Sequence, residues 1–220
     1  MNGESFSTNE ALRFGWDALK RNLSTSIGLS FASLAAVLLL NGFTQASQRH
    51  ATLSLGFTLL TQLAQVFFAL LWIRFALAVY DGQQVETRDL LPDGATFLNY
   101  LAVSIVYGVL VTAGLILLVV PGIYLAVRYG LASFLVADGR TTDVLGAFRQ
   151  SSQLTRGSRG RLFLFGVVLL LLNLAGAIVF GVGLLVTLPM SAFASALVYR
   201  RLATRAAPSW GPPVPLIAAR

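Results

Sequence analysis

Polar side chains stand inside otherwise apolar stretches of this chain, and Arg128 is the most unusual of them. It lies seven residues after Pro121 and ten residues before Asp138. At about 1.5 Å per helical residue, Arg128 is roughly 10–15 Å from either end of its helix. A guanidinium at that depth in a bilayer is costly unless it extends to the interface or finds acceptors. One interpretation is that its long side chain reaches the phosphates of the inner leaflet.

The other interpretation is a polar pocket that Arg128 forms with amide side chains of other spans. Gln62 and Gln65 are three residues apart and share a helix face, and Asn173 lies in a later apolar stretch. Such a pocket would serve a small transporter or channel. Hydrogen bonding between packed helices is the commoner use of isolated amides in membrane proteins. We therefore expect these amides to form hydrogen bonds between packed helices. The alternative is an intramembrane polar cluster of Gln62, Gln65, Arg128 and Asn173.

Side chains that could carry out catalysis are missing from the sequence. There is no cysteine, and the single histidine, His50, is next to Arg49 with no carboxylate nearby in sequence. All nine acidic residues lie outside the apolar stretches, so no buried carboxylate pair is expected for acid–base work. No phosphate-binding glycine loop and no pattern of metal ligands is present. We expect neither an enzyme nor a cofactor or metal site.

The composition indicates a membrane protein. Of 220 residues, 56% are hydrophobic and only 11% are charged, with a mean hydropathy of +0.74. A soluble domain carries about 25% charged residues. One membrane-spanning helix needs about 20 apolar residues. The sequence predicts an all-α, polytopic membrane domain over 1–202 with six spans, in the apolar stretches 26–44, 53–79, 98–120, 122–137, 162–180 and 183–199.

Basic residues are distributed asymmetrically between these stretches. All sixteen except Arg49 fall on one side of the alternating pattern. Short loops rich in Lys and Arg stay in the cytoplasm. We therefore expect a multi-pass protein of the cytoplasmic membrane with both termini in the cytoplasm. The net charge of +7 is then explained by topology and by attraction to anionic lipid head groups, and no nucleic-acid partner is expected.

Three segments read as amphipathic helices on the cytoplasmic surface, at about 8–21, 86–96 and 143–156. Ser7 and Glu10 have the spacing of a capping box at the start of the first. Each segment precedes two spans, so the chain reads as three repeated hairpins related by an axis along the membrane normal. The expected interfacial anchors are Trp16, Arg13, Lys20, Arg21, Arg74, Arg149 and Arg156. Residues 203–220, rich in proline and alanine, are expected to form a disordered cytoplasmic tail.

Three stretches carry a family resemblance. They are Val119-Val120-Pro121-Gly122-Ile123-Tyr124-Leu125-Ala126-Val127-Arg128, then Ala147-Phe148-Arg149-Gln150-Ser151-Ser152-Gln153-Leu154-Thr155-Arg156-Gly157, and the amphipathic opening through Trp16. The chain resembles uncharacterised prokaryotic polytopic membrane proteins similar to the membrane domain fused to some glycerophosphoryl diester phosphodiesterases. Ser152 stands where such proteins often carry tryptophan. The soluble phosphodiesterase domain is absent, so the resemblance implies a fold and a location but no hydrolase activity.

Two functions of different classes follow as hypotheses. The first is a non-catalytic membrane component that organises lipid, or a membrane or cytoplasmic protein partner, at the inner leaflet. The second is a small transporter or channel for an amphiphilic or anionic molecule. The first predicts an interior filled with side chains, and a channel for a soluble ligand needs a wet central cavity.

Overall fold

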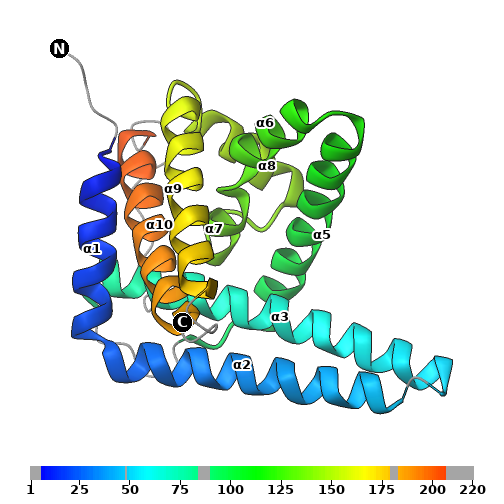
Figure 1. Ribbon diagram of the computed structural model, residues 1–220. Coiled ribbons are helices and arrows are strands. Elements are labelled where there is room, and N and C mark those ends of the chain that lie inside the picture. The colour runs from blue at the N-terminus through cyan, green and yellow to red at the C-terminus, as the bar shows by residue number, and fades with distance from the viewer. Residues whose placement is uncertain (1–5, 48, 84–89, 179–182, 207–220) are drawn as a thin grey trace.

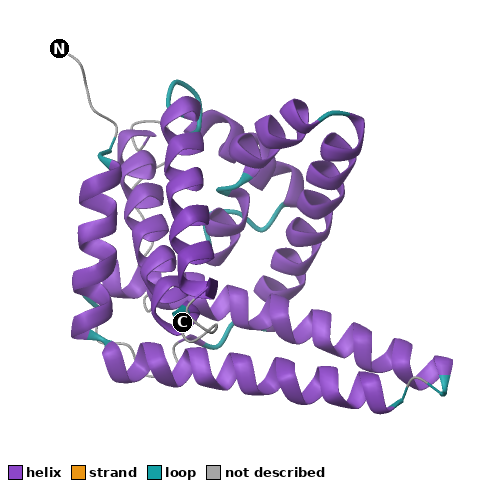
Figure 2. Cartoon of the chain, in the orientation of Figure 1, coloured by secondary structure: helices purple, strands orange, loops and turns teal. Residues whose placement is uncertain are grey.

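The computed structural model describes residues 6–47, 49–83, 90–178 and 183–206. Within these ranges the chain is helical and contains no strand, and short loops join the helices (Figure 2). The helices are α1 (Thr8–Arg21), α2 (Leu23–Ala46), α3 (Ala51–Tyr80), α5 (Gly94–Leu117), α6 (Val119–Tyr129), α7 (Ala132–Ala137), α8 (Val144–Leu154), α9 (Arg159–Ile178) and α10 (Leu184–Ala206).

Helix α10 provides much of the core, and α1 packs antiparallel along it (Figure 1). Glu10, near the start of α1, forms an ion pair with Arg201, near the end of α10. Halfway along the pair, Gly15 faces α10 so closely that an added Cβ would lie 2.5 Å from the carbonyl oxygen of Met190. A glycine at this position is therefore what permits the two helices to approach.

Helices α2 and α3 form a long hairpin. Figure 1 shows them side by side, running across the direction of α1, α9 and α10. Only the second half of α3 enters the core, where the ring of Phe75 contacts Phe193 of α10 at a centroid distance of 5.5 Å. Large apolar side chains such as Phe31 and Leu38 of α2 remain exposed. Exposed apolar surface of this extent is expected of a helix that faces lipid.

Helices α5 and α6 form a second, tighter pair, with α7 and α8 packed beside them. Gly114 and Gly122 face each other across the pair, and a Cβ added to Gly114 would lie 2.8 Å from the Cα of Gly122. Small residues at a helix interface allow this kind of close backbone contact in membranes. The chain turns between the two helices at Leu118, three residues before Pro121, which separates the predicted stretches 98–120 and 122–137.

Five of the described helical segments are long and apolar enough to cross a membrane. They are Leu23–Ala46, Thr52–Tyr80, Gly94–Leu117, Val119–Ala137 and Arg159–Ile178. The coarse prediction of an all-helical, multi-pass membrane protein is therefore confirmed. The sixth predicted span, 183–199, lies in α10, which is not among the five; α10 contains Pro189, and its second half is mostly buried within the protein. The sixth span stays a prediction.

The fourth predicted span is a broken helix. Val119–Ala137 is long enough to cross when counted as one run, but a turn at Gly130 and Leu131 divides it into α6 and α7. The 11 residues of α6 extend only about 16 Å, roughly half of a hydrocarbon layer.

Two of the three predicted interfacial helices are present, as α1 and α8. The capping box is wrong: Ser7 is the N-cap of α1 but its side chain makes no cap hydrogen bond, and Glu10 pairs with Arg201 instead. Asp143 caps α8 through the backbone N–H groups of Leu145 and Gly146.

Other boundaries differ from those predicted. Of the segment 86–96, positions 86–89 lie outside the described residues, 91–93 is not helical, and α5 begins at Gly94. Helix α10 continues through 203–206, the first part of the expected tail, and 207–220 lies outside the described residues. The relation of the three hairpins by one axis stays a prediction; the α2–α3 hairpin runs across α9 and α10 (Figure 1).

Candidate functional site

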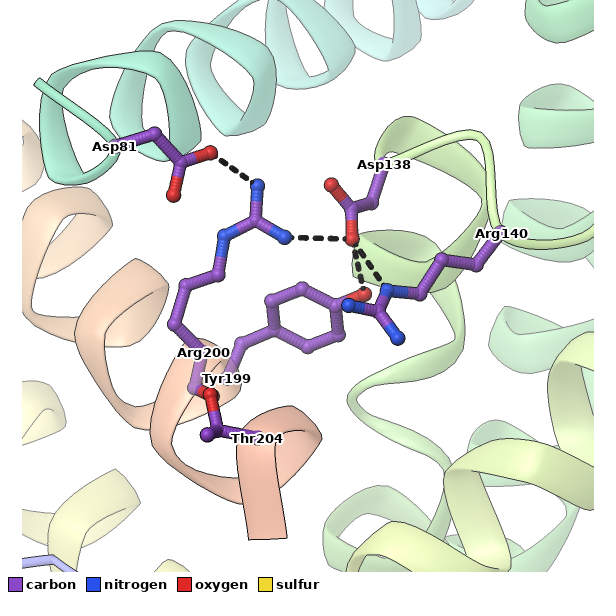
Figure 3. Close-up of polar contacts among 6 residues, drawn as sticks. All are labelled: Asp81, Asp138, Arg140, Tyr199, Arg200 and Thr204. Atoms are coloured by element: carbon purple, nitrogen blue, oxygen red, sulfur yellow. Dashed lines mark hydrogen bonds and ion pairs between the residues drawn. The ribbon is translucent and has the colours of Figure 1, made fainter. Parts of the chain in front are cut away.

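A buried charge cluster lies where α3, α7 and α10 meet, and it consists of Asp81, Asp138, Arg140, Tyr199 and Arg200 (Figure 3). Asp138 is its centre, with a side chain 0% exposed. Its Oδ2 atom accepts hydrogen bonds from Arg140 Nε at 2.7 Å, Tyr199 Oη at 2.8 Å and Arg200 Nη1 at 2.7 Å. An ionised carboxylate without water requires charged partners and several donors, and Asp138 has both.

Arg200 connects this carboxylate to a second one. Its Nη2 atom donates to Oδ2 of Asp81 at 2.5 Å, and its side chain is only 3% exposed. Asp81 follows α3 and Asp138 follows α7, so one guanidinium joins the ends of two helices to α10. Removing Arg200 would leave Asp81 without its guanidinium and leave the buried Asp138 with Arg140 as its remaining charged partner.

Two identical helix ends place the carboxylates. Gly82 and Gly139 have φ values of 67° and 69°, a left-handed conformation that glycine adopts readily. In both turns the next N–H donates back to a carbonyl five residues earlier, from Gln83 to Ala78 and from Arg140 to Leu135, at 3.0 Å each. These are the hydrogen bonds of a Schellman motif. Each Asp is the C-cap residue of its helix and is held in the same local geometry.

The three residues that carry the network also match in sequence. Asp81 ends the segment Val79-Tyr80-Asp81, Asp138 ends Val136-Ala137-Asp138, and Arg200 ends Val198-Tyr199-Arg200. These segments close the three units of the proposed repeat. At one matched position the first two units carry an acid and the third carries a base, so the units attract one another there.

The sequence predicts no buried carboxylate pair for acid–base work, and it does not predict that the single carboxylate of Asp138 is buried. Asp81-Gly82 and Asp138-Gly139 both form turns, but the end of α7 docks against α10 and so removes the Asp138 side chain from water, whereas the Asp81 side chain stays 22% exposed. The signal in the sequence was the repeated Val-x-Asp-Gly, with arginine at the matching position of the third unit.

Burial and charge act in opposite directions on Asp81. Burial raises the pKa of its carboxyl above the usual 3.8 and outweighs the neighbouring Arg200, which lowers it. The second carboxylate, Asp138, adds to the rise. Each carboxylate already faces a guanidinium, so the geometry supports a structural role at the junction of three helices more than acid–base catalysis.

The residues of the alternative polar cluster make hydrogen bonds with other residues or are exposed, and no hydrogen bond in the described part of the chain joins them to one another. Arg128 donates from Nε to Oγ of Ser152 on α8 at 2.9 Å, and its guanidinium lies 5.2 Å from the ring centre of Tyr129. Gln62 and Gln65 are exposed on α3. Asn173 donates to the Ser191 hydroxyl at 3.0 Å, which joins α9 to α10. The packing interpretation therefore fits Asn173.

The backbone of Arg128 is also held by α8. Its carbonyl oxygen accepts hydrogen bonds from Ser151 Oγ at 3.0 Å and Thr155 Oγ1 at 3.3 Å. Ser151 and Ser152 of α8 and its C-cap residue Thr155 thus fix both the main chain and the side chain of this arginine.

The predicted interfacial anchors are mostly exposed. On α1 the buried face is apolar, and Arg13, Trp16, Lys20 and Arg21 lie on the exposed face, where Lys20 Nζ is 5.0 Å from the Trp16 ring centre. Arg149 and Arg156 are exposed at α8. Arg74 is half-buried and donates to the carbonyl of Leu91 at 3.4 Å.

A cavity of about 490 Å³ lies between the α2–α3 hairpin and the first half of α10. Its walls are mainly hydrocarbon, with Ser30, Ser33 and Gln65 as the polar exceptions. The other lining residues include Leu34, Val37, Phe68, Trp72, Leu184, Leu185 and Leu188. Such a surface suits an acyl chain better than a hydrated ion.

Within the described ranges, no group of three or more His, Cys, Asp or Glu side chains could hold a metal ion. No family model matches the chain, and neither a curated protein nor a solved structure matches it. The resemblance to the membrane domain of glycerophosphoryl diester phosphodiesterases therefore stays a prediction.

Proposed function

We propose that this chain is a non-catalytic protein of the cytoplasmic membrane that organises lipid, or a protein partner, at the inner leaflet. The observation that carries the proposal is the two-sided character of α1. One face is buried against α10, and the other presents Arg13, Trp16, Lys20 and Arg21 to the surroundings. Tryptophan beside basic side chains is typical of a surface that meets anionic lipid head groups.

The arrangement of the chain ends supports a topology with both termini in the cytoplasm. The Glu10–Arg201 ion pair brings the start of α1 to the end of α10. Arg161, at the start of α9, lies beside Ser7 and Thr8. Basic residues of α9 and α10 therefore share one end of the molecule with the start of α1, and we assign that end to the cytoplasm by the positive-inside rule.

Lipid composition around the full-length protein tests this proposal. The protein is extracted with its surrounding bilayer in polymer nanodiscs, and the lipids are counted by mass spectrometry. We expect anionic phospholipid to be enriched over the bulk membrane, and the enrichment to fall when Arg13, Lys20 and Arg21 are replaced by glutamine. A lipid composition equal to that of the bulk membrane would contradict an organising role for lipid.

The second candidate is a small transporter of an amphiphilic molecule, and the cavity between α2, α3 and α10 favours it. Hydrocarbon walls open toward the lipid-facing side would admit a molecule from the bilayer. Proteoliposomes loaded with a fluorescent lipid in one leaflet distinguish the two functions. If the fluorescent lipid moves between leaflets at a rate proportional to protein content, the result supports transport. If it moves no faster than in empty liposomes, the result favours the organising role.

A further inference from the structure

Two arginines share one aromatic ring at the junction of α6, α8 and α9. The guanidinium carbons of Arg128 and Arg159 lie 6.0 Å and 5.2 Å from the ring centre of Tyr124. Arg159 also donates from Nη1 to the Tyr124 hydroxyl at 2.6 Å. Ring contacts of this kind hold cationic side chains in place but add no negative charge.

Carboxylates are missing around this pair. Arg140, Arg200 and Arg201 each pair with a carboxylate within 4.0 Å, whereas no carboxylate of the described residues comes that near to Arg128 or Arg159. Both arginines are half-buried, so water screens their charges less than it would on an open surface. The site therefore carries two positive charges without a counter-charge from the described chain.

Exposed hydrocarbon lies on either side of the charges. Val120 is one helical turn before Tyr124 on α6, and Phe163 is one turn after Arg159 on α9. Residues four apart share a helix face. Val120 is 78% exposed, Phe163 is 40% exposed, and Tyr124 itself is 44% exposed. The charges are thus open to a ligand that also has apolar parts.

We propose that Arg128 and Arg159 bind the phosphate of an anionic phospholipid whose acyl chains lie along Val120 and Phe163. A guanidinium offers several N–H donors in a plane that matches the oxygens of a phosphate. Nε of Arg128 is already used by Ser152, which leaves its terminal nitrogens for the ligand. The inference rests on the proposed organising function and names the lipid class and the residues that select it.

Inorganic phosphate has the same charged chemistry and is the competing occupant. The apolar side chains of Val120 and Phe163 add nothing to the binding of free phosphate, whereas they can contact the chains of a lipid. A competition between the two ligands therefore separates these sources.

The experiment uses the purified full-length protein in a neutral detergent with phosphatidylglycerol added in small molar excess. Native mass spectrometry counts the lipid molecules retained by each protein molecule. We expect wild type to retain phosphatidylglycerol in preference to phosphatidylcholine, and the double variant Arg128→Gln/Arg159→Gln to lose that retention by about tenfold, or 1.4 kcal/mol. Inorganic phosphate at millimolar concentration is expected not to displace the lipid.

The matched control is Arg149→Gln/Arg156→Gln, which removes the same charge from exposed positions at α8. Equal loss in both double variants would overturn the site and show a general surface attraction, while the proposed function would stand. Displacement by inorganic phosphate would overturn the lipid assignment. Absence of any anionic preference in wild type would refute the proposed lipid function itself.

A second variant covers loss of folding in the arginine double variant. Tyr124→Phe keeps the ring and removes only the hydroxyl that accepts from Arg159. We expect a severalfold weaker retention of phosphatidylglycerol with an unchanged circular dichroism spectrum. Unchanged retention in this variant, together with an unfolded double variant, would count against the site.

Discussion

Arg200 of α10 donates a 2.7 Å hydrogen bond to Asp138, a residue 62 positions earlier in the chain. The bond joins the end of the second proposed repeat unit to the end of the third, and the same guanidinium reaches Asp81 at the end of the first. The same guanidinium therefore adds a polar contact among all three units to the apolar packing of α3 and α7 on α10.

Arg200→Met is expected to destabilise the protein strongly. It removes the guanidinium that joins Asp81 to Asp138, and Asp138, whose side chain is 0% exposed in the wild type, keeps Arg140 as its remaining charged partner. Breaking a buried pair in this way costs about 3–5 kcal/mol. Thermal unfolding in detergent, followed by circular dichroism, measures the effect.

The neighbouring Arg201→Met is the matched control. Arg201 is 50% exposed and pairs with Glu10 at the surface. An exposed ion pair contributes about 0–1 kcal/mol. Similar losses of stability in the two variants would contradict the assigned role of Arg200.

The environment of Asp81 predicts how the stability of the folded protein depends on pH. Burial raises the pKa of its carboxyl in the folded protein above the usual 3.8. The folded state then holds the proton more tightly than the unfolded chain, so ionisation of Asp81 lowers stability as pH rises through this interval. The unfolding temperature of wild type relative to Asp81→Asn should therefore fall from pH 3.8 up to the folded pKa and stay constant above it.

This comparison needs a background measurement, because other groups titrate in the same range. The variant Asp17→Asn, which removes one carboxyl from the exposed face of α1, provides this background measurement. If the difference between wild type and Asp81→Asn rises with pH after this correction, Arg200 attraction outweighs burial and the assignment is wrong.

Gly15→Ala should separate α1 from α10. The new methyl group would lie 2.5 Å from the Met190 carbonyl oxygen, which is backbone and cannot rotate away. Overpacking of this kind costs about 1–3 kcal/mol. Loss of the contact should also make the start of α1 more sensitive to protease.

Gly28→Ala on α2 is the matched control, and we expect no destabilisation from it. Apart from the adjacent backbone of α2 itself, no atom of the described residues lies within 4 Å of the position of its added Cβ. Alanine favours a helix over glycine by about 0.8–1.0 kcal/mol, so this variant should be neutral or slightly more stable. Equal destabilisation by the two substitutions would show that α1 does not pack on α10 as described.

Local patterns predicted the helices well. The amphipathic period of 8–21 gives α1 with the same bounds, and four apolar stretches give α2, α3, α5 and α9 to within four residues, whereas 122–137 is divided between α6 and α7 and α10 extends beyond 183–199. Periodicity and turn residues act within a few positions of the chain, so they are visible in sequence.

Long-range contacts were predicted poorly. Asp138 follows an apolar stretch and precedes glycine, which reads as an exposed turn; its burial depends on α10, more than fifty residues later. For Arg128 the sequence suggests the amides of other spans as possible hydrogen-bond partners, yet its side chain donates to Ser152 on α8, in the next amphipathic segment. Which helices meet is decided by packing, and one sequence does not contain that information directly.

We propose that one end of the molecule faces the cytoplasm, namely the end that holds the start of α1, the basic start of α9 and the end of α10. The chain has no cysteine, so each introduced cysteine is a unique reporter. Asn9→Cys, Gln153→Cys and Thr204→Cys lie at or near this end, and Thr52→Cys lies near the tip of the α2–α3 hairpin; all four positions are exposed. A membrane-impermeant maleimide should label only Thr52→Cys in intact bacterial cells, and all four after permeabilisation. Labelling of Asn9→Cys or Gln153→Cys in intact cells would contradict a cytoplasmic location of this end.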